Sequence, residues 1–263
     1  MTEKIQKVLA RLGLGSRREI ETWITAGRIK VNRRTAQLGD RIDMHDVVQI
    51  DKRTIKLTHI VQPKRQIICY HKPVGEVCTR HDPEGRPTIF KNLPRLKYQR
   101  WISVGRLDCN TSGLLVLTTD GELAHRLMHP ALQFEREYAV RVLGKVTEEQ
   151  LTRLQTGVVL EDGEAHFEKI IDVGGEGANH WYHATLTEGR KREVRRLWAS
   201  QNITVSRLIR IRFGPISLPP GLKAGHHISL DKNTETLLLK LVGLPKVEKT
   251  SSPGRGGRKQ NRD

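Results

Sequence analysis

Short runs of strand-forming residues, separated by brief turns, dominate residues 66–245 and restrict the folds open to this chain more than any other feature. Each run is rich in β-branched or other apolar side chains and is bounded by turn residues, which is typical of strands. The predicted strands are Gln66–Tyr70, Leu114–Thr118, Arg136–Leu143, His166–Val173, His180–Thr187 and Arg207–Arg212. Apolar residues at helical spacing predict helices at Glu122–Met128, Glu148–Gln155, Glu193–Gln201 and Thr234–Leu241. Because strands outnumber helices and the connections are mostly short, we predict an α+β fold with a mostly antiparallel sheet.

Residues 1–60 follow a different pattern, which predicts a small separate domain. Apolar residues at helical spacing between positions 5 and 12 indicate an amphipathic helix. Ser16 and Glu19 have the spacing of a capping box at the start of a second helix, and Gly27 supplies a stop at its end. Two short strands are predicted, at Arg28–Val31 and Asp46–Asp51.

This N-terminal domain is also rich in basic residues. Positions 1–60 hold 13 basic and 7 acidic residues, a net charge of +6, which is compatible with an ordinary solvated face. The order helix, Gly-Ser-Arg-Arg, helix, Gly-Arg-Ile-Lys-Val-Asn nevertheless resembles the S4 RNA-binding domain over about residues 3–50. The resemblance implies a domain that binds structured RNA and does no chemistry. The candidate RNA contacts are Lys4, Lys7, Arg11, Arg17, Arg18, Arg28 and Lys30.

The charge of the whole chain also favours a nucleic-acid partner. Forty-six Lys and Arg against 29 Asp and Glu give +17, and such an excess favours a polyanion because neutralised phosphates release counterions. Charge alone leaves a membrane surface open, but no stretch joins a basic face to a wide Trp, Phe and Leu face. No apolar run reaches eighteen residues and the N-terminus lacks a signal-peptide pattern, so we expect a cytoplasmic protein with no membrane partner. Its three cysteines form no CxxC pair and are expected to stay reduced.

The stretch from Gly105 to Leu115 is the most informative for chemistry. It places Asp108 in a turn-rich loop that leads into an apolar strand, and an extended approach would put Arg106 on the same side. A neighbouring cation favours the ionised carboxylate. Short polar side chains at positions 110–112 can hold the turn by bonding to the backbone. From this spacing alone, an Asp108 that merely caps the turn is an equally good interpretation.

The same stretch resembles the signature of the RsuA/RluB-type pseudouridine synthases, in which the Asp of Gly-Arg-Leu-Asp is catalytic. Further motifs follow in the family's order, so that the likeness covers nearly the whole chain outside its tail. They are Tyr70–Pro73 (a structural motif), Arg136–Tyr138, Thr187–Arg196 and Val205–Arg210. Within the third motif, Glu193 and Leu197 stand where the family often has Gln and Met. The resemblance implies a pseudouridine synthase that works without a cofactor.

The resemblance also implies a role for each site residue. Asp108 would act on the ribose, Tyr138 would stack on the target base, and Leu208 would close the other side of that base. An arginine of the third motif would pair with Asp108, with Arg190 as our first choice and Arg195 as the second. A uridine inside a helix must first be flipped out, at a cost of about a few kcal/mol. Further expected substrate contacts are Arg106, Arg192, Arg195 and Arg196.

We therefore predict an S4-like domain at 1–60, a linker at 61–65, a catalytic domain at 66–245 and a disordered basic tail at 246–263. The expected partner is ribosomal RNA, preferably a uridine in 23S rRNA or in a large-subunit precursor particle, bound by a monomeric protein. Small-subunit RNA is the alternative substrate. The alternative function is that of a non-catalytic RNA-binding protein that assists ribosome assembly. The sequence leaves open whether the carboxylate attacks carbon or removes a sugar proton.

His125 and His129 have a spacing that can bind a metal on a helix. No carboxylate or cysteine completes the set as in HExxH, and no glycine-rich segment matches a nucleotide-binding motif. We expect neither a metal nor a nucleotide cofactor.

Overall fold

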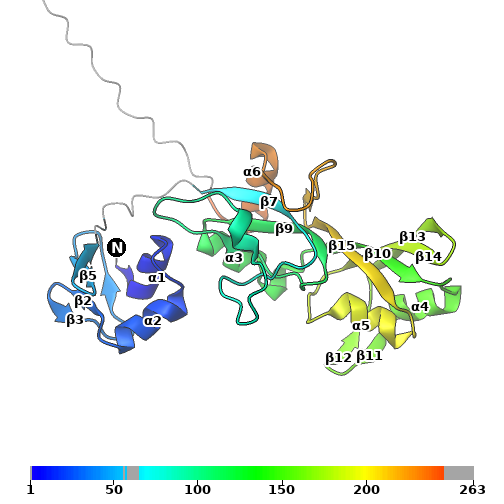
Figure 1. Cartoon of the computed structure of the whole chain (residues 1–263), viewed down its shortest axis with the longest axis horizontal. Coiled ribbons are helices and arrows are strands. Elements are labelled where there is room, and N and C mark those ends of the chain that lie inside the picture. The colour runs from blue at the N-terminus through cyan, green and yellow to red at the C-terminus, as the bar shows by residue number, and fades with distance from the viewer. Residues whose placement is uncertain (1, 56, 58–64, 246–263) are drawn as a thin grey trace, which may run out of the picture.

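The structure is a computed structural model that describes residues 2–55, 57 and 65–245 (Figure 1). The expected linker, apart from residue 65, and the expected tail lie outside the described residues. The described elements form an N-terminal group up to residue 57 and a larger group from residue 65 onward. Each group has its own hydrophobic core, as two separately folding domains require.

The N-terminal group contains two short helices beside two small sheets. The Ser16–Glu19 capping box forms as predicted, and Gly27 follows the second helix with a φ of +67°. Ile5 and Ile20, one from each helix, are completely buried in the shared core. The elements are β1 (Glu3–Lys4), α1 (Ile5–Arg11), α2 (Arg17–Thr25), β2 (Ile29–Val31), β3 (Arg34–Thr35), β4 (Arg41–Ile42), β5 (Val48–Ile50) and β6 (Arg53–Ile55).

A nine-stranded sheet organises the described residues from 65 onward. Its main order is β13-β14-β10-β15-β9-β7-β17, with β16 added beside β15 and β8 beside β9. Apart from the pairing of β9 with β15, its neighbouring strands are antiparallel. The strands are β7 (Ile67–Lys72), β8 (Ile102–Ser103), β9 (Ser112–Thr118), β10 (Arg136–Leu143), β13 (Lys169–Glu176), β14 (Asn179–Leu186), β15 (Val205–Phe213), β16 (Ile216–Ser217) and β17 (His227–Ser229).

Helices cover both faces of this sheet, and a separate hairpin lies beside it. The remaining elements are the 3₁₀ turns η2 (Ile89–Asn92) and η3 (Pro130–Leu132), helices α3 (Gly121–Leu127), α4 (Glu148–Thr156), α5 (Glu193–Ser200) and α6 (Lys232–Leu241), and the hairpin of β11 (Val158–Leu160) and β12 (Gly163–Ala165). Leu114 and Val116 of β9 share a core with α3 and α6, whereas Leu115 and Leu117 share the other core with α4 and α5. Both faces of β9 are therefore buried, which explains its uninterrupted apolar sequence.

The parallel contact between β9 and β15 is short and close. Only two residue pairs are in register, Ser112 with Ile209 and Gly113 with Arg210. Gly113 has a φ of +105°, and a Cβ atom built on it would lie 2.3 Å from the carbonyl oxygen of Arg210. The Arg210 side chain also crosses to β9, where its Nε donates to the carbonyl of Leu114 at 2.8 Å. A glycine is needed here because both the backbone conformation and the lack of space exclude a side chain.

The α+β class and the mostly antiparallel sheet are confirmed, with instructive differences in detail. Arg136–Leu143 forms β10 with the predicted bounds. Strand β13 begins at Lys169 rather than at His166 and continues past Val173 through Gly174 and Gly175 to Glu176, so that the turn falls at residues 177–178. Gly175 pairs with His180 within the strand ladder. A glycine is needed there, because a Cβ atom on residue 175 would lie 2.2 Å from the carbonyl oxygen of Asn179. The β11–β12 hairpin was not predicted, because its three-residue strands are too short to show a period.

We predict that Gly113→Ala lowers the free energy of unfolding by about 2–5 kcal/mol, since it adds backbone strain to a steric overlap. Urea denaturation measures the change. The matched control is Gly144→Ala, where φ is +87° but the added Cβ meets nothing within 4 Å. That control should cost only about 1–2 kcal/mol. Equal losses in the two variants would contradict the close approach at Gly113.

Candidate active site

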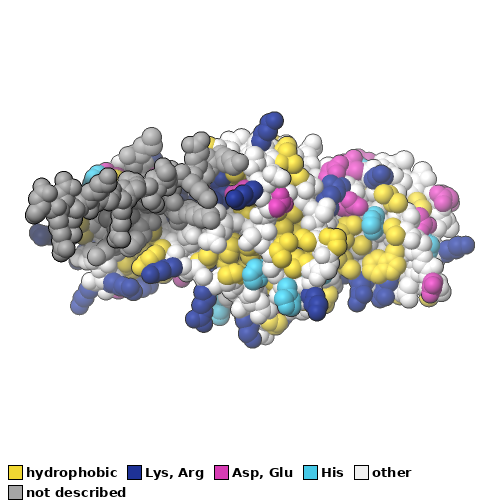
Figure 2. Space-filling view, turned by 90° about the horizontal axis from the view of Figure 1, so that it is seen from above, with side chains coloured by type: hydrophobic (Ala, Val, Ile, Leu, Met, Phe, Trp, Pro, Cys, Tyr) yellow, Lys and Arg dark blue, Asp and Glu magenta, His cyan; other side chains and the backbone are white. Residues whose placement is uncertain are grey.

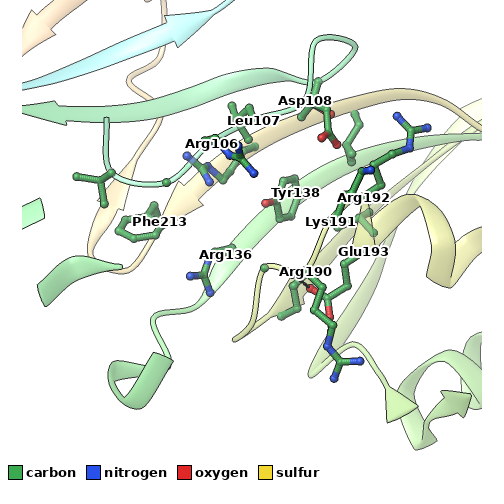
Figure 3. Close-up of a pocket in the computed structure, with 18 of the residues that line it drawn as sticks. Arg106, Leu107, Asp108, Arg136, Tyr138, Arg190, Lys191, Arg192, Glu193 and Phe213 are labelled. Carbon is green, nitrogen blue, oxygen red and sulfur yellow. Dashed lines mark hydrogen bonds and ion pairs between the residues drawn. The ribbon is translucent and has the colours of Figure 1, made fainter. Parts of the chain in front are cut away.

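A cavity of about 470 Å³ opens beside the junction of β9, β10 and β15 (Figure 3). The loop before β9 forms one wall through residues 103–108, and the segment from residue 189 to 194 forms the opposite wall. Six basic and two acidic residues line it, so the cavity has an excess of positive charge. Of the predicted site residues, Asp108, Tyr138, Arg190, Arg106, Leu208 and Arg192 all line this cavity.

Buried groups anchor the loop that carries Asp108. The side chain of Lys72, at the end of β7, has no exposed surface, and its Nζ donates to the carbonyls of Pro73, Cys109 and Thr111 at 2.9, 3.4 and 2.8 Å. Burial lowers the pKa of Lys72. The backbone N–H of Thr111 closes the turn onto the carbonyl of Asp108 at 3.0 Å. The main chain of Asp108 is thus fixed by groups behind it, and its side chain is left for the cavity.

The carboxylate of Asp108 is half-buried and has no hydrogen bond or ion pair within the described residues. The guanidinium of Arg195 in α5, a residue of the third motif, lies close enough to Asp108 for the two charges to interact. It donates to the carbonyls of Asn110 and Val205 at 2.9 and 2.8 Å. Burial and the neighbouring Arg192 lower the pKa of Arg195, while the charge of Asp108 acts in the opposite direction. Arg195 therefore interacts with the charge of Asp108 without a hydrogen bond or ion pair to it.

Arg190, our first choice as the partner of Asp108, points elsewhere. Its Nε donates to Glu188 at 2.9 Å and its Nη2 to the carbonyl of Glu164 at 2.7 Å. In Figure 3 its guanidinium is directed away from Asp108. The chain turns sharply at Arg192, which adopts a left-handed φ of +53° before α5 begins. Side chains before and after this turn point in different directions. The expected Arg190–Asp108 ion pair does not form in this structure.

Tyr138 and Leu208 lie on the adjacent strands β10 and β15. Both are almost fully buried, with 8% and 4% of their surfaces exposed. The register shifts between Glu137 and Tyr138, so that Ile211 of β15 has no partner on β10. Such a bulge redirects side chains locally. Tyr138 then stands opposite Arg210, two pairs along from the Val140–Leu208 pair.

The other arginines of the third motif have partners inside the protein. Both terminal nitrogens of Arg196 contact the carboxylate of Asp162, at 2.6 and 2.8 Å. Arg192 is exposed and reaches Asn110 Oδ1 at 3.4 Å. Arg106 is exposed at the rim of the cavity. Arg106 and Arg192 are therefore better placed for substrate than Arg195 and Arg196.

Most predicted RNA contacts of the N-terminal group lie on its surface. Lys7 and Arg11 both pair with Glu3, and Arg28 pairs with Asp51. Six of the seven are exposed and one is half-buried: Lys4, Lys7, Arg17, Arg18, Arg28 and Lys30 are exposed, and Arg11 is half-buried.

Comparison with known proteins places this geometry in a family. The family model described as RNA pseudouridylate synthase matches residues 66–200, and the S4 domain model matches residues 3–48. The chain belongs to the RNA pseudouridylate synthase family. It is 57% identical over 246 residues to "Ribosomal large subunit pseudouridine synthase B" of Pseudomonas aeruginosa, a match that covers 93% of this chain and 64% of that protein. The protein of the same name from Escherichia coli (strain K12) is 55% identical over 247 residues, with 93% and 85% covered.

The fold has a counterpart among solved structures. A crystal structure of a pseudouridylate synthase matches with a TM-score of 0.62 at 24% identity, covering 90% of this chain and 99% of the other. This likeness concerns the fold alone. Within the described part of the pseudouridylate synthase chain, no three His, Cys, Asp or Glu side chains are grouped to hold a metal ion. None of the helices described is long and apolar enough to cross a bilayer.

Three residues of this pseudouridylate synthase site were not singled out from the sequence. Lys72 belonged to a motif interpreted only as structural, and Arg136 and Arg210 were read only as parts of longer motifs. Arg210 lies between Ile209 and Ile211, which is a signal available in the sequence because a buried charge needs a specific partner or a function. Arg136 stands beside Glu137 and Lys72 beside His71, so their sequence neighbours give no such signal.

Glu193 gives the site a pH-dependent contribution to stability. Burial, together with the adjacent Glu188, raises the pKa of Glu193 to about 7. The folded state therefore binds a proton more tightly than the unfolded chain, and stability falls as the pH rises from about 4.5 to 7. Glu193→Gln stays neutral, so it should be more stable than the wild type by about 1–3 kcal/mol at pH 8.

This difference should shrink towards zero near pH 4.5, as urea denaturation across that range can measure. Glu149→Gln is the matched control, because Glu149 lies exposed on α4, and it should show no such pH-dependent gain. A Glu193→Gln effect of equal size at both ends of the pH range would contradict the assignment.

Proposed function

We propose that this protein converts a uridine of ribosomal RNA to pseudouridine, with Asp108 as the catalytic carboxylate. The observation that carries the proposal is the position of that side chain. It lines the same cavity as Tyr138 and Leu208 and has no partner of its own within the described residues. The carboxylate oxygens of an Asp that only capped its turn would accept hydrogen bonds from backbone N–H groups. The turn is instead closed by the backbone of Asp108 and by Lys72.

The reaction needs few protein groups. The N1–C1′ bond of uridine breaks, the uracil turns, and a C5–C1′ bond forms, so that no atom is gained or lost and no redox cofactor is needed. Asp108 acts at the ribose, either by attack of a carboxylate oxygen on C1′ or by removal of the C2′ proton. Tyr138 stacks on one side of the base and Leu208 packs on the other. A base that fills the cavity displaces water from it, so each charge then acts more strongly than in bulk solvent.

The target nucleotide reaches this cavity by leaving its stack, because the cavity admits a base and not a helix. Arg106 at the rim is placed to fill the vacated position or to hold a phosphate. Lys and Arg side chains follow the lower margin of the molecule in Figure 2, over both the N-terminal part and the larger domain. Such a surface attracts RNA through its phosphates. The S4-like domain then supplies affinity and the cavity supplies chemistry.

A uridine of the large-subunit 23S rRNA is the substrate that we favour. The relatives in Pseudomonas aeruginosa and Escherichia coli are both called ribosomal large subunit pseudouridine synthase B. Their identity to this chain extends through both domains, since each match covers 93% of it. A non-catalytic assembly role is less well supported, because such a protein would have no need of an unpaired carboxylate in this cavity.

We predict that Asp108→Asn folds and binds its RNA but forms no pseudouridine, because an amide can neither attack C1′ nor accept the C2′ proton. Chemical mapping of pseudouridine in rRNA treated with each protein measures the product. Thermal unfolding and RNA binding provide the controls for structure. Product formation at the wild-type rate would contradict the assignment of Asp108 as the catalytic carboxylate.

We also predict that Arg17→Gln combined with Arg18→Gln weakens RNA binding and reduces the slope of log affinity against log salt by about 1–2. Both residues are exposed at the start of α2. Lys169→Gln, an exposed substitution on β13 of the larger domain, should leave the slope unchanged. Identical slopes for all three proteins would exclude phosphate contacts at the start of α2.

A further inference from the structure

Two arginines and one aromatic ring form a cationic cluster at one end of the cavity. The guanidinium carbon of Arg136 lies 5.6 Å from the centre of the Phe213 ring, and that of Arg210 lies 5.5 Å from the same centre. All three residues line the cavity, and they come from the two strands that also carry Tyr138 and Leu208. The cluster is thus part of the rigid sheet rather than of a loop.

The cluster has more positive charge than the protein neutralises. Arg210 is only 3% exposed, and its Nη2 is buried without a hydrogen-bond partner. Arg136 donates through Nη1 to the carbonyls of Phe134 and Thr187. Neither guanidinium has an ion-pair partner among the described residues. Burial lowers the pKa of Arg136, and the adjacent charge of Arg210 adds to this effect while Tyr138 opposes it.

Tyr138 separates this cluster from the catalytic carboxylate. It stands opposite Arg210 in the β10–β15 register. In Figure 3 its hydroxyl oxygen points towards the side where Arg106, Arg136 and Phe213 lie, and Asp108 lies on the other side. Asp108 and the Arg136–Arg210 cluster therefore lie on opposite sides of Tyr138, and a base stacked on Tyr138 would lie between them.

We propose that Arg136 and Arg210 form a binding site for the uracil monoanion that exists while the base is detached from the ribose. This inference rests on the proposed function. When N1–C1′ breaks, its electron pair stays on N1 and the uracil becomes an anion. The ribose is balanced either by a new bond from an Asp108 oxygen to C1′, or by transfer of the C2′ proton to Asp108 with formation of a C1′=C2′ bond. The electron pair of the uracil anion then forms C5–C1′. As this bond forms, either the bond between the Asp108 oxygen and C1′ breaks, or Asp108 returns its proton to C2′ as the C1′=C2′ double bond is consumed. Loss of the C5 proton and protonation of N1 complete the pseudouridine.

The detached base fits the cluster better than a phosphate does. A phosphate remains attached to the solvated RNA backbone and is expected at the exposed rim, where Arg106 and Arg192 lie. Arg210, in contrast, is only 3% exposed and lines the cavity from β15, the strand that also carries Leu208. Two unneutralised cations repel each other in the resting enzyme, and the repulsion is relieved when negative charge develops on the base. Groups that bind the reacting state better than the substrate accelerate the chemical step.

The test compares Arg136→Gln and Arg210→Gln in single-turnover reactions with RNA that contains the target uridine. Each variant should lose about 10²–10³-fold in rate, as enzymes do when one donor to a developing anion is removed. The RNA dissociation constant and its salt slope should stay at wild-type values. The matched control is Arg141→Gln, which removes a guanidinium from the same strand, where it lies over Trp181 outside the cavity. This control should react at the wild-type rate.

A second substrate shows whether a lower rate comes from lost electrostatic stabilisation of the anion or from misfolding of the variant. Fluorine at C5 makes uracil a better anion, so 5-fluorouridine in the same RNA needs less help from the arginines. Loss of its N-glycosidic bond should therefore be slowed less by each variant than the reaction of uridine is. Arg136→Lys, which keeps the charge, should recover most of the rate. If Arg210→Gln fails to fold in thermal unfolding, the two Arg136 variants decide the question.

Several results would overturn the inference. A weaker RNA affinity with a salt slope reduced by about 1 would assign the cluster to a phosphate. An unchanged rate, or equal losses on uridine and 5-fluorouridine, would remove the anion site. A wild-type protein that makes no pseudouridine in any rRNA would instead refute the proposed function, which is a separate outcome.

Discussion

The close approach of Gly113 in β9 to Arg210 in β15 brings together the two halves of the cavity, the Asp108 loop and the strands β10 and β15. On one side of this contact, β9 continues from the loop that presents Asp108; on the other, β15 carries Leu208 and lies beside β10 with Tyr138. The backbones can meet only because residue 113 has no side chain. The contact also brings the Arg210 side chain to the carbonyl of Leu114. One parallel pairing in an antiparallel sheet thus sets the distance between the Asp108 loop and the strands that carry Leu208 and Tyr138.

The charges around the cavity are arranged by the same framework. Lys72 holds the Asp108 loop through its carbonyls, and Arg195 holds it from α5 through the carbonyl of Asn110. Both cations lie near the carboxylate but donate their hydrogen bonds to backbone oxygens. Neither forms an ion pair with Asp108, so the carboxylate oxygens remain available to the cavity. At the opposite wall, Asp162 of the β11–β12 turn takes up Arg196. Among the described residues, Arg106 and Arg192 at the rim and Arg136 and Arg210 beside Tyr138 have no ion-pair partner, and their charges remain for the proposed RNA substrate.

The sequence predicted the elements with a strong period and missed those that depend on tertiary contacts. Strand β10 and the capping box at Ser16 are local patterns, and both appear as predicted. The direction of the Arg190 side chain depends on the left-handed turn at Arg192 and on the carbonyl oxygen of Glu164, which accepts its hydrogen bond and is distant in sequence. No pattern in the third motif distinguishes Arg190 from Arg195 in this respect. The charge of Arg210 was visible, but its position under Phe213 follows only from the pairing of β9, β10 and β15.

The proposed reaction requires the target uridine to lie in one cavity, between Asp108 and the side chains of Arg136 and Arg210. A crystal structure of Asp108→Asn bound to an RNA that contains the target uridine tests this most directly. We expect an extruded nucleotide whose base lies between Tyr138 and Leu208, with C1′ about 3.5 Å from the side chain at position 108. An RNA that binds with its uridines stacked and this cavity empty would contradict the account.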